Sequence, residues 1–274
     1  MTFSLVARDP ATGRLGVAVS TCALAVGRAV PWARAGVGAA ATQATTNRAY
    51  GARGLTLLAD GYPPEEALAK VRADDPDPSQ RQVGMIDVTG RTAAWTGRGC
   101  LSACGHVTGD GFTAQGNMLA SRSVIPSLVE GYLEARGEFA ERLLAGLAAA
   151  QEAGGDLRGR QSAAMMVVAA DRRPDPWDGV LIDLRVDDAR EPVAELLRLL
   201  QLQRAYETSD HETLARDAPG GLRDLHAALA AAQRGDRHTA ADALRTLRRR
   251  PGWDGWLRRM QSSGKMPGTQ TLLD

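Results

Sequence analysis

The first nine residues, Met1–Asp9, contain the residue types of a self-contained acyl-transfer site. The small residue at position 2 allows removal of Met1, which would leave Thr2 with a free α-amino group. That amine titrates at about 7.7–8.0, so it can accept the proton of its own threonine hydroxyl near neutral pH. One residue would then supply both nucleophile and general base. The alternative is that Met-Thr is only a common beginning of a protein chain.

A glycine and an amide at the end of an expected strand could complete this site. The run Gln115-Gly116-Asn117 has a glycine where the backbone can approach a ligand closely. An asparagine amide can donate hydrogen bonds to a developing oxyanion. We therefore expect Asn117 to act with Thr2, and Arg8 and Asp9 to orient the Thr2 amine or set its charge. Arg8 and Asp9 face the same side only if the strand ends there.

A charged strand near residue 185 is the other candidate contact region. Strand alternation places Asp183, Arg185 and Asp187 on one face of this strand. The pattern indicates either an ion-pair ladder or a substrate contact. The expected substrate-binding residues are Gln43, Gln115, Gly116, Arg185 and Asp187.

Other chemistries find less support in the sequence. Cys100, Cys104 and His106 are spaced like part of a metal site, but a fourth ligand is not evident. Cys22 follows an expected strand and could act as a thiol nucleophile, although no histidine is assignable as its base. The chain has no glycine-rich phosphate loop and no Gly-x-Ser-x-Gly elbow. We expect neither a metal ion nor a cofactor.

Composition indicates an ordinary globular protein without a charged partner. The chain has 274 residues, a net charge of +1 and 44% hydrophobic residues, a balance typical of folded domains. Three cysteines are too few for a secreted disulfide scaffold, and no segment resembles a membrane span or a signal peptide. We expect a cytoplasmic homodimer or higher homo-oligomer that binds a small-molecule substrate, and neither nucleic acid nor membrane.

The order of the expected elements favours layered sheets with helices outside over a strict parallel βαβ series. Apolar, β-rich runs at 3–9 and 15–20 flank Pro10–Gly13, which is typical of a hairpin turn. Further strands are expected at 37–43, 82–88, 92–96, within 106–117, at 163–170 and at 180–186. Helices are expected at 50–60, 63–71, 123–134, 138–153 and 192–206.

Helical periodicity without strand signals marks the C-terminal part of the chain. Residues 222–234 and 239–249 predict two helices, and a last short helix begins at Trp253. We therefore expect a main domain over 1–206 and a small helical region over 207–274. This region could pack on the main domain or on a second subunit, or it could form a separate ligand-binding or peptidoglycan-binding module.

A series of motifs runs in order along residues 1–206: Met1–Asp9, Gly16–Val19, Ala25–Gly27, Val30–Ala33, Gly36–Ala39, Thr42-Gln43, Tyr50–Leu55, Arg81–Gly84, Thr96-Gly97, Gln115–Asn117, Gln161–Ala164 and Asp183–Asp188. This series resembles the bacterial domain-of-unknown-function 1028 family, which is classed with the N-terminal-nucleophile (Ntn) hydrolases. The resemblance implies an α+β fold, a four-layer αββα sandwich of two antiparallel sheets, followed here by a small all-helical appendage.

The resemblance implies an amidohydrolase that uses Thr2, after removal of Met1, on a small amide or acylated amino compound. Many relatives of the family that the chain resembles have a lysine at the position of Cys22, and proteasome-type Ntn sites use a lysine to lower the effective pKa of the nucleophile. Here neither Lys70 nor Lys265 is close to the N-terminal strands in sequence, and an arginine cannot shuttle a proton. Two alternatives stay open: a non-catalytic metabolite-binding or scaffold protein of this fold, and a thiol hydrolase that uses Cys22.

Overall fold

The structure, a computed structural model, describes residues 2–101 and 103–264. The chain divides into two compact units, residues 1–197 and 198–274, and the boundary falls within helix α5 (Pro192–Thr208). The predicted division after residue 206 stays a prediction.

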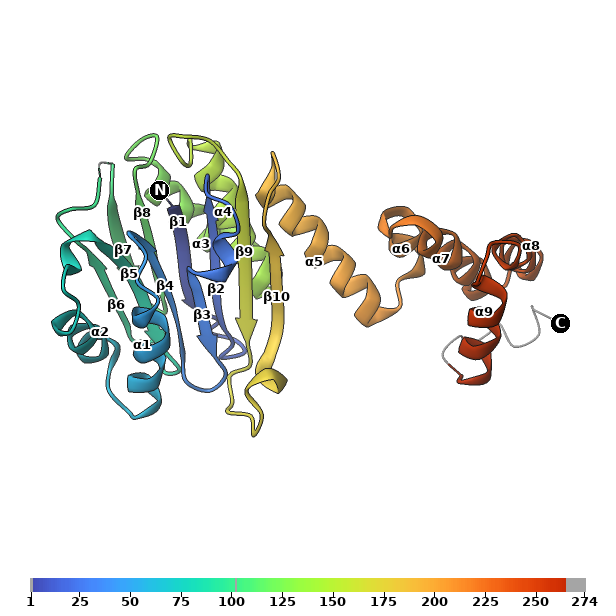
Figure 1. The fold of residues 1–274 in the computed structure, drawn as a ribbon, viewed down its shortest axis with the longest axis horizontal. Coiled ribbons are helices and arrows are strands. Elements are labelled where there is room, and N and C mark those ends of the chain that lie inside the picture. Colours follow the sequence, from blue (N-terminus) through green and yellow to red (C-terminus); the bar gives the residue numbers. More distant parts are fainter. Residues whose placement is uncertain (1, 102, 265–274) are drawn as a thin grey trace. The chain divides into compact units, whose positions relative to one another are not determined.

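Two antiparallel sheets form the centre of the first unit (Figure 1). The six-stranded sheet has the order β10 (Val180–Val186), β9 (Ser162–Val168), β2 (Leu15–Thr21), β1 (Thr2–Arg8), β8 (Phe112–Asn117) and β7 (Gly105–Gly109). The four-stranded sheet has the order β3 (Pro31–Arg34), β4 (Gly38–Ala44), β5 (Arg81–Asp87) and β6 (Thr92–Thr96). The N-terminal strand β1 is therefore an inner strand of the larger sheet.

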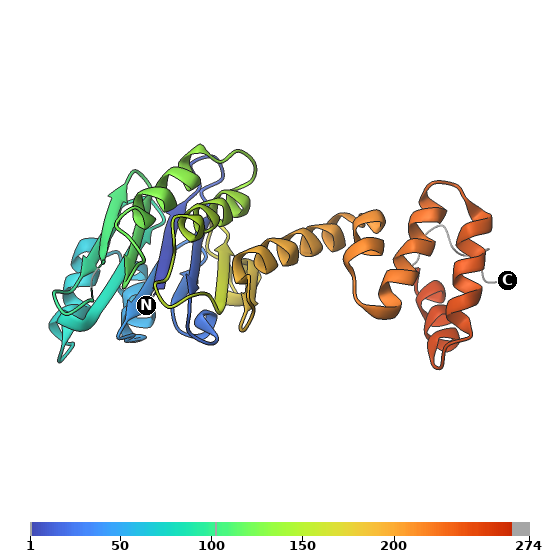
Figure 2. The same cartoon turned by 90° about the horizontal axis from the view of Figure 1, so that it is seen from above.

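Two pairs of helices cover the outer faces of the sheets. Helices α1 (Ala49–Ala59) and α2 (Pro64–Ala73) pack on the four-stranded sheet. Helices α3 (Val124–Glu134) and α4 (Phe139–Glu152) pack on the six-stranded sheet. Figure 2 shows the resulting order of helix, sheet, sheet and helix. The predicted α+β fold, a four-layer αββα sandwich, is confirmed.

Strand alternation decides which side chains lie between the sheets. Ser4 and Val6 of β1 point toward the four-stranded sheet, so Phe3 and Leu5 point toward the helices. The facing strand β4 has the sequence GAAATQA, and its small side chains let the two sheets approach closely. The buried residues between the sheets include Val6, Val17, Val19, Ala39, Ala41 and Ile86.

Gly16 shows how closely α4 packs on the outer face of the six-stranded sheet. A Cβ at this position would lie 2.6 Å from Leu143 Cδ1 and 2.8 Å from Phe139 Cε1. A side chain at this position would require Leu143 and Phe139 to move, so the glycine allows the close packing of α4 on the sheet.

Some short elements of the first unit fall outside the predicted set. Strand β3 has only four residues and begins with a proline at the edge of its sheet, where a missing N–H is tolerated. Single 3₁₀ turns occur at η1 (Val26–Arg28), η2 (Pro78–Gln80) and η3 (Pro176–Gly179). The predicted strands and helices of this unit all occur, with small shifts of their ends.

The second unit is helical. Asp236 begins one of its helices by accepting a hydrogen bond from the backbone N–H of Thr239. Its helices after α5 are α6 (His211–Asp217), α7 (Gly220–Gln233), α8 (Arg237–Arg248) and α9 (Trp253–Ser262). The buried core that joins α7, α8 and α9 contains Leu225, Leu229, Leu244, Leu247 and Leu257. No helix in the described part of either unit has the length and apolarity needed to cross a membrane.

Candidate functional site

Thr2 opens strand β1, and its side chain lies between the two sheets. Only 7% of Thr2 is exposed, and its Oγ1 donates to Thr21 Oγ1 of β2 at 3.3 Å. On the other side, Thr2 pairs with Asn117, the last residue of β8. Because β1 runs antiparallel to both neighbours, its beginning meets their ends. We call this end of the sandwich the Thr2 end.

The loops that follow β2 and β8 are tied together at the Thr2 end by Asp156. Its carboxylate accepts a hydrogen bond from the backbone N–H of Cys22 at 2.9 Å and pairs with Arg158. Asp156 also forms a β-bridge with Leu119. The side chain is almost fully buried. Nothing in the sequence around Asp156 predicts this role, which depends on three segments that meet only in the fold.

The non-glycine residues of the first unit that have left-handed backbone in the described structure lie at the Thr2 end. Ala25, Ala44 and Met118 have φ values of 56°, 68° and 52°, a region that costs a non-glycine residue about 1–3 kcal/mol. Ala25 follows β2, Ala44 ends β4, and Met118 follows Asn117 directly. Such residues persist only where the surrounding structure holds them, and they gather at functional sites.

Neutral polar side chains fill the space between the sheets beneath Thr2. Ser4 Oγ donates to Gln43 Oε1 at 2.7 Å and accepts from Gln115 Nε2 at 2.7 Å. Gln43 Nε2 donates to the Thr2 carbonyl oxygen at 3.1 Å and to Gln82 Oε1 at 2.8 Å. Ser4 and all three glutamines are completely buried. A network of this kind is rigid, because leaving any member unpaired in a dry interior is costly.

Three of the predicted substrate-binding residues belong to this buried layer. The amides of Gln43 and Gln115 are committed to protein groups, and the Gly116 carbonyl accepts from Gln82 Nε2 at 2.8 Å. The structure thus brings Gln43, Gln115 and Gly116 to the Thr2 end, but as supports of the site rather than as groups that face a ligand.

Asn117 is the predicted site residue whose side-chain amide can still donate a hydrogen bond to a ligand. The residue is 1% exposed, and its Nδ2 donates to Gln82 Oε1 at 2.9 Å. A carboxamide nitrogen carries two N–H groups, and no partner for the second is seen among the residues that the structure describes. The Asn117 amide is therefore oriented by one hydrogen bond and has a second N–H for a ligand.

Arg8 and Asp9 lie at the opposite end of β1, which we call the Asp9 end. Because the strand is extended, Thr2 and Arg8 are about 20 Å apart. Neither side chain orients the Thr2 amine, so this prediction is corrected. Closeness in sequence is misleading here because a strand converts each residue into a step of about 3.3 Å.

The Asp9 end uses its charges for structure. Arg8 Nε donates to the Val88 carbonyl at 2.8 Å, which joins the two sheets. Asp9 accepts from the backbone N–H and the hydroxyl of Thr12 and pairs with Arg142 of α4. Burial favours a higher pKa for Asp9, but the Thr12 bonds and the Arg142 charge outweigh it and hold this pKa below its ordinary value.

Arg185 and Asp187 are also remote from Thr2. They lie on or just after β10, three strands from β1, which corresponds to about 14 Å across the sheet. Arg185 Nε donates to Asp183 Oδ1 at 3.0 Å, and Nη2 donates to Oδ2 at 3.0 Å. The structure therefore shows the ion pair that alternation predicts, and it places Arg185 and Asp187 three strand spacings to the side of Thr2, where the Asp187 carbonyl accepts from the backbone N–H of Ala25.

Comparison with known proteins identifies the family. The model of DUF1028, a family of unknown function, matches residues 2–196. The chain belongs to the DUF1028 family. A crystal structure of protein SPO2555 from Silicibacter pomeroyi, also assigned to DUF1028, is 36% identical with a TM-score of 0.66, over 74% of this chain and 88% of that chain. No curated protein matches the chain.

The thiols and imidazoles of this DUF1028 chain do not form a nucleophile–base pair in the described residues. Cys22 is partly buried and lies next to Thr21. His106 Nδ1 contacts Thr96 Oγ1 at 2.9 Å, and His211 and His226 contact each other. No cluster of three or more His, Cys, Asp or Glu side chains in the described parts of the chain is placed to hold a metal ion.

One hollow of the first unit lies near the Thr2 end. It has a volume of about 660 Å³ and lies along edge strand β7 and the beginning of α3. Two strand spacings, about 10 Å, separate β7 from β1. The residues that line it include Cys104, His106, Leu119, Arg122 and Ile125.

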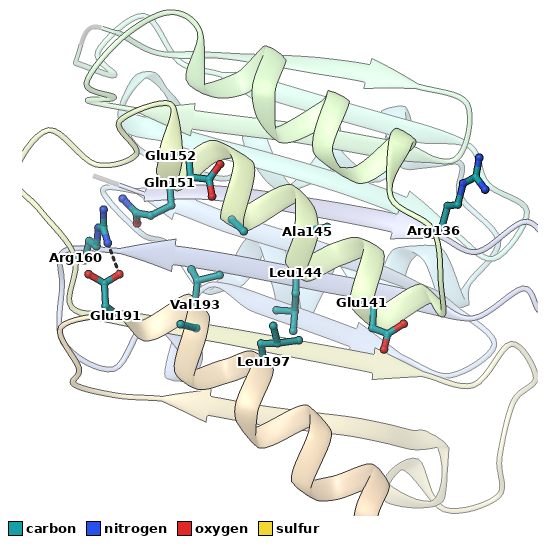
Figure 3. Close-up of a pocket in the computed structure, with 12 residues that line it drawn as sticks. Arg136, Glu141, Leu144, Ala145, Gln151, Glu152, Arg160, Glu191, Val193 and Leu197 are labelled. Carbon is teal, nitrogen blue, oxygen red and sulfur yellow. Dashed lines mark hydrogen bonds and ion pairs between the residues drawn. The ribbon is translucent and has the colours of Figure 1, made fainter. Parts of the chain in front are cut away.

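A second hollow, of about 510 Å³, is a groove between α4 and the first turns of α5 (Figure 3). Leu144, Val193 and Leu197 line it, and the ion pair of Arg160 and Glu191 lies at one end. The groove lies on the helix side of the six-stranded sheet, whereas the Thr2 side chain points between the sheets. It therefore does not present a ligand to Thr2.

Proposed function

We propose that this DUF1028 protein is an N-terminal-nucleophile amidohydrolase in which Thr2 attacks a small amide or acylated amino compound. The observation that carries the proposal is the position of Thr2. It begins an inner strand of the larger sheet, with its hydroxyl 3.3 Å from Thr21 Oγ1 and its backbone paired with Asn117. The mechanism requires removal of Met1, because only then is the Thr2 amine free.

The reaction needs no group beyond Thr2 for its proton transfers. As Thr2 Oγ1 bonds to the amide carbonyl carbon, the α-amine takes the hydroxyl proton, and it then gives this proton to the departing nitrogen. The C–N bond breaks and leaves an ester on Thr2. Water then attacks the ester and gives a proton to the amine, which returns it to Oγ1 as the acid departs. The products are an amine and a carboxylic acid.

Asn117 and Thr21 support this chemistry from either side. The second N–H of Asn117 is the candidate donor to the oxyanion of each tetrahedral intermediate, where such a donor contributes a few kcal/mol. The Thr21 hydroxyl accepts from Thr2 Oγ1 and holds its rotamer. The resemblance implies a lysine at the position of Cys22 in many relatives, and here neither Lys70 nor Lys265 is close to Thr2 in sequence. We expect the rate to rise with pH as the Thr2 amine loses its proton, at about 7.7–8.0.

The first experiment determines the N-terminus by mass spectrometry of the native protein. We expect loss of Met1, and retention of Met1 would overturn the mechanism. The second experiment screens a panel of small amides and N-acyl amino compounds with wild-type protein, Thr2→Ser and Thr2→Ala. Turnover is expected in the first two and absent in Thr2→Ala.

The same panel distinguishes the two alternatives. A non-catalytic binding or scaffold protein would show no turnover with any variant. A thiol hydrolase would retain turnover in Thr2→Ala and lose it in Cys22→Ser. A cytoplasmic location and a homo-oligomeric assembly are part of this proposal, and size-exclusion chromatography with light scattering tests the assembly.

A further inference from the structure

Gln82 occupies a central place in the polar layer between the sheets, although no motif predicts a role for it. It lies on β5 of the four-stranded sheet and is completely buried. Its side chain reaches the six-stranded sheet, where it donates to backbone carbonyls of β7 and β8 near Thr2. The amide of Gln82 therefore connects the four-stranded sheet to the six-stranded sheet.

Each part of the Gln82 amide is used. Its Oε1 accepts from Gln43 Nε2 at 2.8 Å and from Asn117 Nδ2 at 2.9 Å. Its Nε2 lies within donating distance of three oxygens: the Gly116 carbonyl at 2.8 Å, the Gly105 carbonyl at 3.0 Å and Thr96 Oγ1 at 3.0 Å. Carbonyl oxygens only accept hydrogen bonds, so the amide has one orientation that satisfies its surroundings.

This fixed amide controls two groups at the Thr2 end. Through Oε1 it orients the Asn117 amide directly. It also holds Gln43, whose Nε2 donates to the Thr2 carbonyl oxygen at 3.1 Å. The candidate oxyanion donor and the backbone of the candidate nucleophile therefore depend on the same side chain.

We propose that Gln82 is a positioning residue that sets the mutual geometry of Asn117 and Thr2. The inference rests on the proposed function, because it assigns Gln82 a role in the reaction at Thr2. Gln82 does not touch the reacting atoms. It acts by aiming one N–H of Asn117 at Gln82 itself, which leaves the other for the oxyanion.

A covalent probe tests this role without knowledge of the natural substrate. A β-lactone acylates an activated hydroxyl, opens its strained ring and leaves an ester of added mass equal to the lactone. The second-order rate of adduct formation on Thr2 is measured by mass spectrometry at a temperature where each variant is folded. Gln82→Met has a similar size but lacks the acceptor and donors, and we expect a rate at least tenfold below wild type.

Thr113→Val is the matched control for loss of a buried hydrogen bond. Thr113 lies in the same layer and on the same strand as Asn117, and its hydroxyl donates to Gln115 Oε1 at 2.8 Å. No hydrogen bond joins Thr113 to Asn117 or to Gln82 in the described structure. We expect Thr113→Val to lose stability while it keeps the wild-type labelling rate within threefold.

Gln82→Glu tests the same role through the pH dependence of the labelling rate, which a purely structural role would not change. It also replaces Gln82→Met if that variant fails to fold. A Glu carboxylate would face the Gly116 and Gly105 carbonyls, but a protonated Glu can donate to one of them and still accept from Asn117. We expect its labelling rate, relative to wild type at the same pH, to recover as the pH falls from 8 to 5.5.

The outcomes separate the two proposals. If wild-type Thr2 forms the adduct and Gln82→Met labels as fast, or Gln82→Glu shows no relative recovery in acid, the role of Gln82 is overturned and the proposed function stands. If wild-type protein that has lost Met1 forms no adduct on Thr2, the proposed function and the role of Gln82 are both overturned.

Discussion

The two ends of strand β1 are built from different kinds of side chain. At the Thr2 end, Ser4 and Asn117 bond to glutamine side chains between the sheets and Thr2 Oγ1 bonds to Thr21 Oγ1, while the ion pair of Asp156 and Arg158 belongs to the loop that follows α4. At the Asp9 end, Asp9 pairs with Arg142 and Arg8 binds the Val88 carbonyl. The charged side chains Arg8 and Asp9 therefore stabilise turns and a helix, and the candidate site is recognised by its neutral hydroxyl and carboxamide groups instead.

The two ends also differ in which residue types have left-handed backbone. The hairpin turns at the Asp9 end use glycine for their left-handed residues: Gly13, Gly36, Gly90 and Gly111. The Thr2 end places Ala25, Ala44 and Met118 in this region instead. Glycine adopts positive φ without strain, whereas these three residues do not. One end is therefore relaxed, and the other is held in a strained form by its surroundings.

Breaking the ion pair at the Asp9 end gives the largest expected loss of stability. Asp9→Asn leaves Arg142 partly buried without its counter-charge, and we expect a loss of about 3 kcal/mol in the free energy of unfolding, measured by urea denaturation. Asp183→Asn breaks an exposed pair with Arg185 and should cost under about 0.5 kcal/mol. If folded Asp9→Asn protein reacted tenfold more slowly than wild type with the β-lactone at Thr2, the Asp9 end would affect the Thr2 end, contrary to this comparison.

Removing one hydroxyl tests the rigidity of the polar layer at the Thr2 end. Ser4→Ala leaves Gln43 Oε1 and one Gln115 N–H without the partner they share, and we expect a loss of about 2 kcal/mol. Ser79→Ala is the control, because its hydroxyl bonds Asp77 at an exposed position. Equal, small effects of both changes in chemical denaturation would mean that the buried layer relaxes and does not hold Thr2.

Acid should weaken the Asp9 end selectively. The pKa of Asp9 is lowered in the folded protein, so the ionised form stabilises the fold at pH values above the unfolded pKa. This contribution is lost as the pH falls from about 4 toward the folded pKa. We expect the melting temperature of wild type to fall more steeply than that of Asp9→Asn over this range. Equal slopes of melting temperature against pH in the two proteins would contradict the conclusion that ionised Asp9 stabilises the fold.

Relief of backbone strain at the Thr2 end gives the smallest expected effect. Ala44→Gly removes the Cβ that disfavours a φ of 68°, and we expect a gain of about 0.5–1 kcal/mol in the free energy of unfolding. Ala41→Gly on the same strand has ordinary strand geometry and should destabilise by about 1 kcal/mol or more. If Ala44→Gly destabilises equally, residue 44 is not strained.

Most of the fold could be predicted because its local patterns agree with its tertiary structure. The turn at Pro10–Gly13 and the alternation of 180–186 give β1, β2 and β10 with nearly correct ends. Strand β3 could not be predicted in this way, since four residues that begin with proline carry too short a pattern. Its pairing with β4 is decided by packing in the sheet.

The candidate site was predictable only in part. Thr2 and Asn117 carry chemical signals of their own, and antiparallel pairing makes them neighbours. Gln82 and Asp156 acquire their roles only when two sheets, or three loops, come together. Closeness in sequence suggested Arg8 and Asp9, but an extended strand carries them to the other end of the sandwich.

The most direct test of the central claim is to locate a β-lactone adduct by tandem mass spectrometry on native protein whose N-terminus has been determined. The account predicts loss of Met1, a single ester on Thr2, and no adduct in Thr2→Ala. A second chain with an alanine inserted before Thr2 blocks the free amine and should also remain unlabelled. An adduct on Cys22, or an unmodified Thr2 in a chain that begins at Thr2, would contradict the assignment of Thr2 as nucleophile.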